Sequence, residues 1–108
     1  MRTVTLVVLL PLLAAAPASG QQPTAACRVE LGQVDDSFAE TQARLSKAGN
    51  AGAVEKCAAV AHHIDVMSKA VEVYTRCLPP GHDRSENLAQ LNASIADFHD
   101  IQANLKCR

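Results

Sequence analysis

The sequence predicts an all-α protein, a three-helix up-down-up antiparallel bundle linked by two disulfides. Apolar residues recur at steps of three and four along three long segments, and no segment alternates as a strand would. Short stretches that contain glycine or proline separate the three segments. Four cysteines in a chain of 108 residues give an even number of partners for disulfides.

The chain begins with the features of a secretory signal peptide. Arg2 gives a basic start, an apolar run follows from Val4 to Ala16, and Ala18-Ser19-Gly20 fits the small-x-small rule for cleavage. The run is too short to span a bilayer, which takes roughly 20 apolar residues. We therefore expect residues 1–20 to be removed. The remaining chain is expected in the periplasm or outside the cell, with no membrane span.

A lipoprotein signal, with Cys27 as the lipidated residue, is the alternative. Small residues precede Cys27, but the usual leucine three positions before it is missing. The stretch Gln21-Gln22-Pro23 also separates Cys27 from the apolar run. We therefore assign residues 21–26 to a disordered lead-in and residues 27–108 to the folded domain.

Charge and size limit the possible functions. Loss of Arg2 changes the formal net charge from -1 to -2, so the chain has no basic excess to attract nucleic acid or an anionic membrane. A domain of this size buries only roughly 60–65% of its unfolded surface. Disulfides are therefore expected to supplement a modest core, which contains few aromatic side chains.

The first helix is expected from about Ala26 to Lys47. It is followed by Gly49, Asn50 and Gly52, residues that tolerate positive φ and so predict a turn. A single narrow apolar row marks the packed side of the helix. The row consists of Cys27, Leu31, Val34, Phe38, Thr41 and Leu45.

The second helix is expected from about Ala53 to Leu78 and has the widest apolar surface. Two neighbouring rows together cover about half of its circumference, so it should contact two other helices. Pro79 and Pro80 end it, because proline cannot continue the hydrogen-bond ladder. The rows are Val60, Ile64, Met67, Val71, Tyr74 and Leu78, and Ala59, Val66, Ala70, Val73 and Cys77.

The third helix is expected from about Arg84 to Lys106. Asp83 is the expected N-cap, with Glu86 three residues later completing a capping-box-like pair, and Ser85 is the alternative cap. Short loops between three similar helices predict an up-down-up bundle with the second helix in the middle. The apolar row is Leu88, Leu91, Ile95, Phe98, Ile101 or Gln102, and Leu105.

Helix geometry selects one of the three possible cysteine pairings. Cys57 and Cys77 lie on one helix, ~30 Å apart, whereas a disulfide needs Cα atoms within ~7 Å. Pairing Cys27 with Cys57 leaves a mismatch of ~24 Å along the helix axis. We therefore predict the disulfides Cys27–Cys77 and Cys57–Cys107, one at each end of the bundle.

Cys107 fits this pairing less well, because on an ideal helix it points away from the apolar row. Either the last turn unwinds to let Cys107 reach Cys57, or this disulfide lies on the outer flank of the helix pair. Reactive or metal-binding thiols are the alternative use of the cysteines. The sequence has no Cys-x-x-Cys and no close Cys/His cluster with zinc spacing.

The adjacent histidines His62 and His63 are expected to face different surroundings, because neighbouring helix residues diverge by ~100°. His62 falls on the polar face. His63 falls in the apolar arc, where we expect a buried histidine that is hydrogen-bonded to another helix. A copper or zinc site made by His63, Met67 and His99 is the alternative, since His63 and His99 lie equally far from the second turn. A pH-sensing role, in which burial lowers the pKa of His63, is a further alternative.

No catalytic motif is present, neither Gly-x-Ser-x-Gly, nor a phosphate-binding glycine loop, nor His-Glu-x-x-His. The acidic residues Asp35, Asp36, Asp97 and Asp100 are expected to be solvated, and the faces of the bundle offer no obvious cleft. We expect no cofactor and no enzymatic activity. The sequence therefore predicts a small exported binding or interaction protein.

The expected partner is another protein, and the chain is also a possible homodimer. The part of the second helix left exposed is the surface that such a partner would contact. Two alternative functions remain open. One is a periplasmic metal-binding protein that uses His63, Met67 and His99, and the other is an acid-stress or inhibitor-type protein with a pH-sensitive His63.

Overall fold

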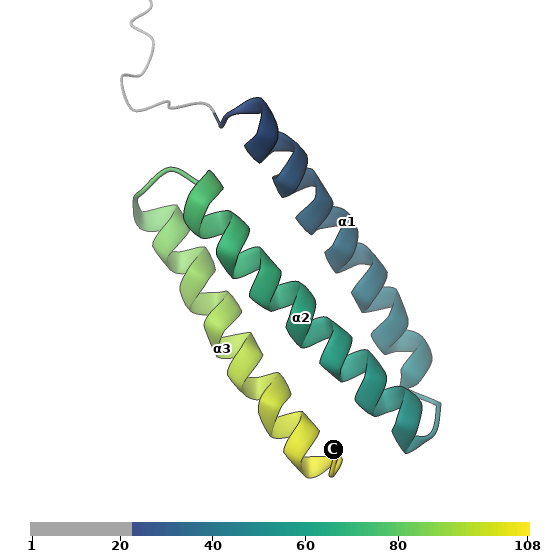
Figure 1. Ribbon diagram of the computed structural model, residues 1–108. Helices are drawn as coiled ribbons and strands as arrows, with labels where there is room; N and C mark the ends of the chain where they lie inside the picture. The colour runs from purple at the N-terminus through teal and green to yellow at the C-terminus, as the bar shows by residue number, and fades with distance from the viewer. Residues whose placement is uncertain (1–22) are drawn as a thin grey trace, which may run out of the picture.

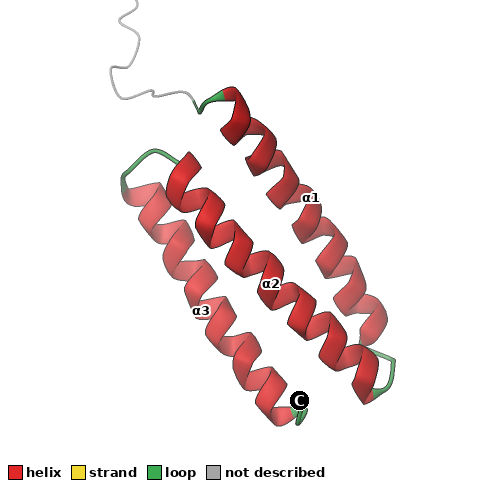
Figure 2. Ribbon diagram, viewed as in Figure 1, coloured by secondary structure: helices red, strands yellow, loops and turns green. Residues whose placement is uncertain are grey.

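The structure is a computed structural model that describes residues 23–108, so the predicted signal peptide lies outside the described residues. Three α-helices follow one another: α1 (Ala25–Ala48), α2 (Ala53–Cys77) and α3 (His82–Asn104). They run antiparallel, with α2 between α1 and α3 (Figure 1). Short loops connect them, and no strand interrupts the described part of the chain (Figure 2). The all-α, up-down-up prediction is confirmed.

The two outer helices pack against the middle helix but not against each other. α2 packs against α1 and against α3, whereas no Cα atom of α1 lies within 8 Å of a Cα atom of α3. Because α3 packs against α2 and not against α1, none of its residues is fully buried. The bundle is therefore open on one side. The buried residues are Val34, Thr41 and Ala48 of α1, and Ala59, Val60, His63, Ile64, Met67, Ala70, Val73 and Cys77 of α2.

The core consists of two clusters, both centred on α2. One joins Val34 of α1 to Ala70, Val73 and Cys77, and the other contains Val60, Ile64 and Met67. Two side chains from the outer helices pack against both clusters, and these are Phe38 of α1 and Leu91 of α3. Side chains of α1 and α3 therefore approach each other over α2, although their backbones do not.

The first turn of α1 is capped by Thr24, whose Oγ1 accepts a hydrogen bond of 3.1 Å from the Cys27 backbone N–H. Ala25 and Ala26, which we had assigned to the lead-in, are therefore helical. The turn predicted at Gly49, Asn50 and Gly52 follows α1. It forms without positive φ at either glycine, because Gly49 has φ −56° and Gly52 has φ −72°. The Gly49 N–H continues the right-handed turn by donating to Leu45 O and Ser46 O.

The connection from α2 to α3 needs a glycine. Leu78 is extended, as expected before Pro79, and Gly81 has φ 152° and ψ −170°. Gly81 is the N-cap of α3 and provides no side chain for capping, so the prediction of an Asp83 cap is wrong. The unusual Gly81 backbone starts the helix at His82, which places Asp83 inside the first turn.

The last turn of α3 unwinds, as the first of our two explanations for Cys107 requires. Lys106 has φ 55°, its N–H donates to Ala103 O, and the Cys107 N–H donates to Gln102 O. These two bonds form the Schellman motif that commonly ends helices. The motif turns Cys107 back toward Cys57 of α2.

Both predicted disulfides are present. The Cα atoms of Cys27 and Cys77 are 5.2 Å apart, and those of Cys57 and Cys107 are 5.6 Å apart. Each bond spans 50 residues, and no cysteine is left free. Two disulfides indicate an oxidising compartment. No helix among residues 23–108 is both long enough and apolar enough to cross a membrane.

Candidate functional site

His63 lies between the two outer helices, at the centre of the molecule. Its side chain is buried, and its Nδ1 lies 3.2 Å from Oγ1 of Thr41, which is also buried. Its ring meets Phe38 edge-on with centroids 6.4 Å apart, and it lies against Phe98 at 4.4 Å. The prediction of a buried histidine that is hydrogen-bonded to another helix is confirmed.

These surroundings favour the uncharged imidazole. Burial lowers the pKa of His63 below its ordinary value of 6.5, and the nearby His62 lowers it further by charge repulsion. The three side chains in contact with the ring, Phe38, Thr41 and Phe98, carry no charge. Protonation of His63 would therefore place a positive charge in an apolar site without a carboxylate to stabilise it.

The three residues of the predicted metal site occupy different surroundings. Met67 is buried in the same part of α2 as His63. His99 is exposed on α3, and its Nδ1 lies 3.1 Å from Oε1 of Gln102 on the same helix. His63 and Met67 are therefore both buried on α2, whereas the His99 side chain lies against Gln102 of its own helix. A metal site at His63, Met67 and His99 stays a prediction, which titration with Cu(I), Cu(II) and Zn(II) would test.

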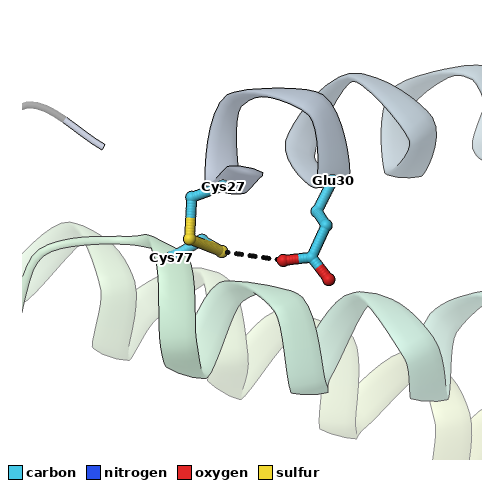
Figure 3. A group of neighbouring side chains, drawn as sticks. All are labelled: Cys27, Glu30 and Cys77. Carbon is cyan, nitrogen blue, oxygen red and sulfur yellow. Dashed lines mark hydrogen bonds between the residues drawn. A yellow bond between two sulfur atoms is a disulfide. The ribbon is translucent and has the colours of Figure 1, made fainter. Parts of the chain in front are cut away.

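A different group of donors lies at the Cys27–Cys77 end. Cys27, Glu30 and Cys77 place one donor atom each within 4.8 Å of one another (Figure 3). Both sulfurs belong to the disulfide, so neither is a thiolate and neither carries a proton. Glu30 Oε2, 3.5 Å from Cys77 Sγ, is therefore in contact with the sulfur and not bonded to a thiol. The group does not have the chemistry of a metal site.

Glu30 has a different partner, which connects α1 to α2. Its two carboxylate oxygens accept hydrogen bonds of 2.9 and 3.0 Å from the guanidinium of Arg76. This bidentate pair lowers the pKa of Glu30 and raises that of Arg76. The Arg76 side chain is 52% exposed and that of Glu30 is 31% exposed, so solvent weakens the pair and it adds little to stability.

An apolar groove of about 310 Å³ lies over the first part of α2, with α1 on one side and α3 on the other. We call it the α1–α3 groove. The prediction that the bundle offers no cleft is wrong, because it assumed a closed bundle and the two outer helices do not meet. The groove is lined by Leu45, Ala48, Gly49, Lys56, Val60, Phe98, Ile101 and Leu105.

Two lining residues differ from the rest. Lys56, on the floor, is the one charged residue of the lining, and sequence analysis did not single it out. Ile101, on the α3 wall, is 39% exposed, whereas the adjacent Gln102 is half-buried. The apolar row of α3 therefore continues through Gln102. α3 is therefore rotated so that Ile101 lies beside the groove and not in the core.

A second groove, of about 400 Å³, lies between α1 and α2 and has a mixed lining. It contains charges of both signs, and two of them already have partners: Glu30 pairs with Arg76, and Lys69 pairs with Glu72. The carboxylates expected to be solvated, Asp35, Asp36, Asp97 and Asp100, are all exposed. Among the described residues, the α1–α3 groove is therefore the better candidate site.

No protein-family model, no curated protein and no solved structure matches this chain. The residues of the groove and their geometry carry the functional argument.

Proposed function

We propose that the protein is a small exported, non-catalytic binding protein, and that the α1–α3 groove is its binding site. The supporting observation is an apolar groove of about 310 Å³ left by the open packing of the helices. Ligand pockets in proteins are mostly apolar, with a few placed polar groups, and measure roughly 300–1,000 Å³. Export is supported by the signal-like residues 1–20 and by the two disulfides.

The groove is held in shape before any ligand arrives. α1 is joined to α2 by a loop at one end and by Cys27–Cys77 at the other. α3 is joined to α2 in the same way, with Cys57–Cys107 at the groove end. The two walls therefore cannot move far from the floor. A preformed site loses little conformational entropy on binding, which favours affinity.

The partner predicted from the sequence, another protein, stays a prediction. A homodimer has less support. The large apolar side chains most exposed in residues 23–108 are Val29, Val54 and Ile101, one on each helix, and Ile101 is the one that lines the groove. A stable interface needs about 800 Å² on each partner, which three scattered side chains do not supply.

Binding of the neutral dye Nile red to the protein with both disulfides intact tests the proposal. We expect saturable one-to-one binding that Ile101→Glu weakens roughly ten-fold, because a charge on the wall must lose its hydration. Val29→Glu is the matched control, since Val29 is also an exposed β-branched residue and lies outside the groove. Binding that both variants weaken equally, or no saturable binding, would exclude the groove as the site.

A screen of hydrolase substrates tests the non-catalytic part of the proposal. We expect no turnover above that of a control protein. Turnover that a single substitution abolishes would replace the proposed binding function with an enzymatic one.

A second candidate function, a response to acid, is favoured by one observation. Phe98 both lies against the buried His63 ring and lines the groove. Protonation of His63 would therefore disturb a wall of the binding site. Nile red affinity measured from pH 7.5 to pH 4.5 tests this: we expect a loss in acid that His63→Gln removes, and an equal loss in both proteins would contradict it.

A further inference from the structure

Lys56 is the one charged residue in the lining of the α1–α3 groove. It lies one turn before Val60 on the floor of the groove and is half-buried. In the described part of the chain, no carboxylate lies within ion-pair distance of its ammonium group. Its neighbour Glu55 lines a different groove, between α1 and α2.

In the described residues the Lys56 ammonium group has no carboxylate partner, so it can pair with an anionic group of a ligand. Lysine is a compact point charge with three donors, suited to one small anionic group at the end of a ligand. The remaining lining residues are apolar or glycine, so they accept only an apolar body. The lining as a whole therefore matches a molecule with one anionic end and one hydrocarbon body.

We propose that the α1–α3 groove binds a free, single-chain carboxylate amphiphile, with its carboxylate on Lys56 Nζ and its alkyl chain along Val60, Phe98 and Leu105. This inference rests on the proposed function, because it names the ligand class of the same groove.

The size of the groove favours one chain of medium length. A volume of about 310 Å³ is at the lower end of the range for ligand pockets, which leaves no room for a second acyl chain. Along α3 the lining runs from Phe98 to Leu105, which corresponds to roughly 10 Å of helix. Decanoate is therefore a suitable probe.

The experiment compares three probes that share one alkyl chain: decanoate, the neutral decanol and the cationic decyltrimethylammonium. Each displaces Nile red from the oxidised protein at concentrations below its micelle threshold. We expect decanoate to bind roughly ten-fold more tightly than decanol, the factor typical of one hydrogen bond to a charged group. Decyltrimethylammonium should bind more weakly than both.

Two variants test the role of Lys56. Lys56→Met keeps the length and the apolar stem, and it should remove the preference for decanoate, so that decanoate no longer binds more tightly than decanol. Lys56→Gln is the second variant, should methionine alter the packing. Lys47→Met is the matched control, because Lys47 is an exposed lysine at the same end of the molecule and lies outside the groove lining. It should leave all three affinities unchanged.

The outcomes separate this inference from the proposed function. Equal binding of decanoate and decanol, with no effect of Lys56→Met, overturns the carboxylate ligand and leaves a groove that binds apolar molecules. Absence of Nile red and probe binding overturns both.

Two further measurements test other occupants of the groove. Co-sedimentation with phosphatidylglycerol vesicles, combined with no binding of free decanoate, would assign the groove to a membrane surface. A dimer in analytical ultracentrifugation that Ile101→Glu dissociates would assign it to a second copy of the chain. Either result overturns the inference.

Discussion

At the scale of single residues, His63 links the packing of the helices to pH. It is the titratable side chain that residues 23–108 bury most completely, and burial lowers its pKa below the ordinary value of 6.5. In the unfolded chain the same imidazole takes up its proton near pH 6.5. The unfolded state therefore binds more protons than the native state as the pH falls through this range, and the native state loses stability.

We therefore expect the free energy of unfolding to be constant above about pH 7 and to decrease as the pH falls from 6.5 toward the lowered pKa of His63. His63→Gln, which keeps a hydrogen-bonding group near Thr41 but cannot titrate, should flatten this decrease. Urea unfolding followed by circular dichroism at a series of pH values measures the free energy of unfolding of each protein. His99→Gln, at an exposed histidine of α3, is the control and should keep the wild-type profile; an equal flattening in both variants would contradict the assignment to His63.

The sequence predicted the positions and contacts of some residues but not of others. The cysteine pairing and the different surroundings of His62 and His63 follow from distances and angles along single helices, which the sequence contains. The Thr41 partner of His63 and the position of Lys56 depend on how each helix is rotated against its neighbours. That rotation is set by the packing of Phe38, His63 and Phe98, which no single-helix argument includes.

At the scale of the helices, two glycines should respond in opposite ways to the same substitution. A Cβ atom at Gly32 or at Gly81 would meet no other atom within 4 Å, so only the backbone distinguishes them. Gly81 has φ 152°, a conformation that costs other residues roughly 1–3 kcal/mol. Gly32 lies inside α1, where alanine is better by roughly 0.5–1 kcal/mol.

Thermal unfolding should therefore show a lower midpoint for Gly81→Ala and a higher one for Gly32→Ala. The comparison is internally controlled, because each variant adds one methyl group to an open site. Shifts of the same sign would show that the φ of Gly81 is not the cause.

The end of α3 provides a second prediction. Lys106 occupies the left-handed position of the Schellman motif, where glycine is usual, at φ 55°. Lys106→Gly should raise the free energy of unfolding by roughly 0.5–1 kcal/mol, since relief of the left-handed strain exceeds the entropy that glycine adds to the unfolded chain. Lys106→Ala removes the same charge but keeps the Cβ, and we expect it to change stability little. Equal stabilisation by both would attribute the effect to charge.

The helices themselves were predicted to within about two residues of their ends, because apolar periodicity and the proline pair mark them clearly. Their caps were predicted less well. Asp83 resembles an N-cap by residue type, but α3 begins at His82 after Gly81, two residues earlier than a cap at Asp83 would allow. Ideal helix angles also could not choose between Ile101 and Gln102, since they do not include how α3 is rotated against α2.

At the scale of the whole molecule, the sequence predicted which helices touch but not that the bundle stays open. The two apolar rows of α2 require two neighbours, and this requirement is met whether or not the neighbours touch each other. In the structure Phe38 of α1 and Phe98 of α3 both lie against the His63 ring of α2, while the backbones of α1 and α3 stay apart. The groove results from this spacing, so it could not be predicted from single helices.

Because the bundle is open between α1 and α3, the stability of α3 depends strongly on the Cys57–Cys107 disulfide. α3 has no fully buried residue, whereas α1 buries Val34, Thr41 and Ala48. Removing Cys57–Cys107 by a double alanine substitution should lower stability by up to about 4 kcal/mol in the chain-entropy model. We expect amide hydrogen exchange to increase mainly in α3, while α1 and α2 stay protected. The Cys27→Ala/Cys77→Ala variant is the control, and a uniform increase over all three helices after loss of Cys57–Cys107 would contradict the prediction.

The position of the two disulfides also determines what a protease can do to the molecule. Each pair of neighbouring helices is closed into a covalent ring, by a loop at one end and a disulfide at the other. A cut in either loop, or in both, leaves every helix attached to α2. A nicked molecule would therefore keep its mass on a non-reducing gel, together with both walls of its groove.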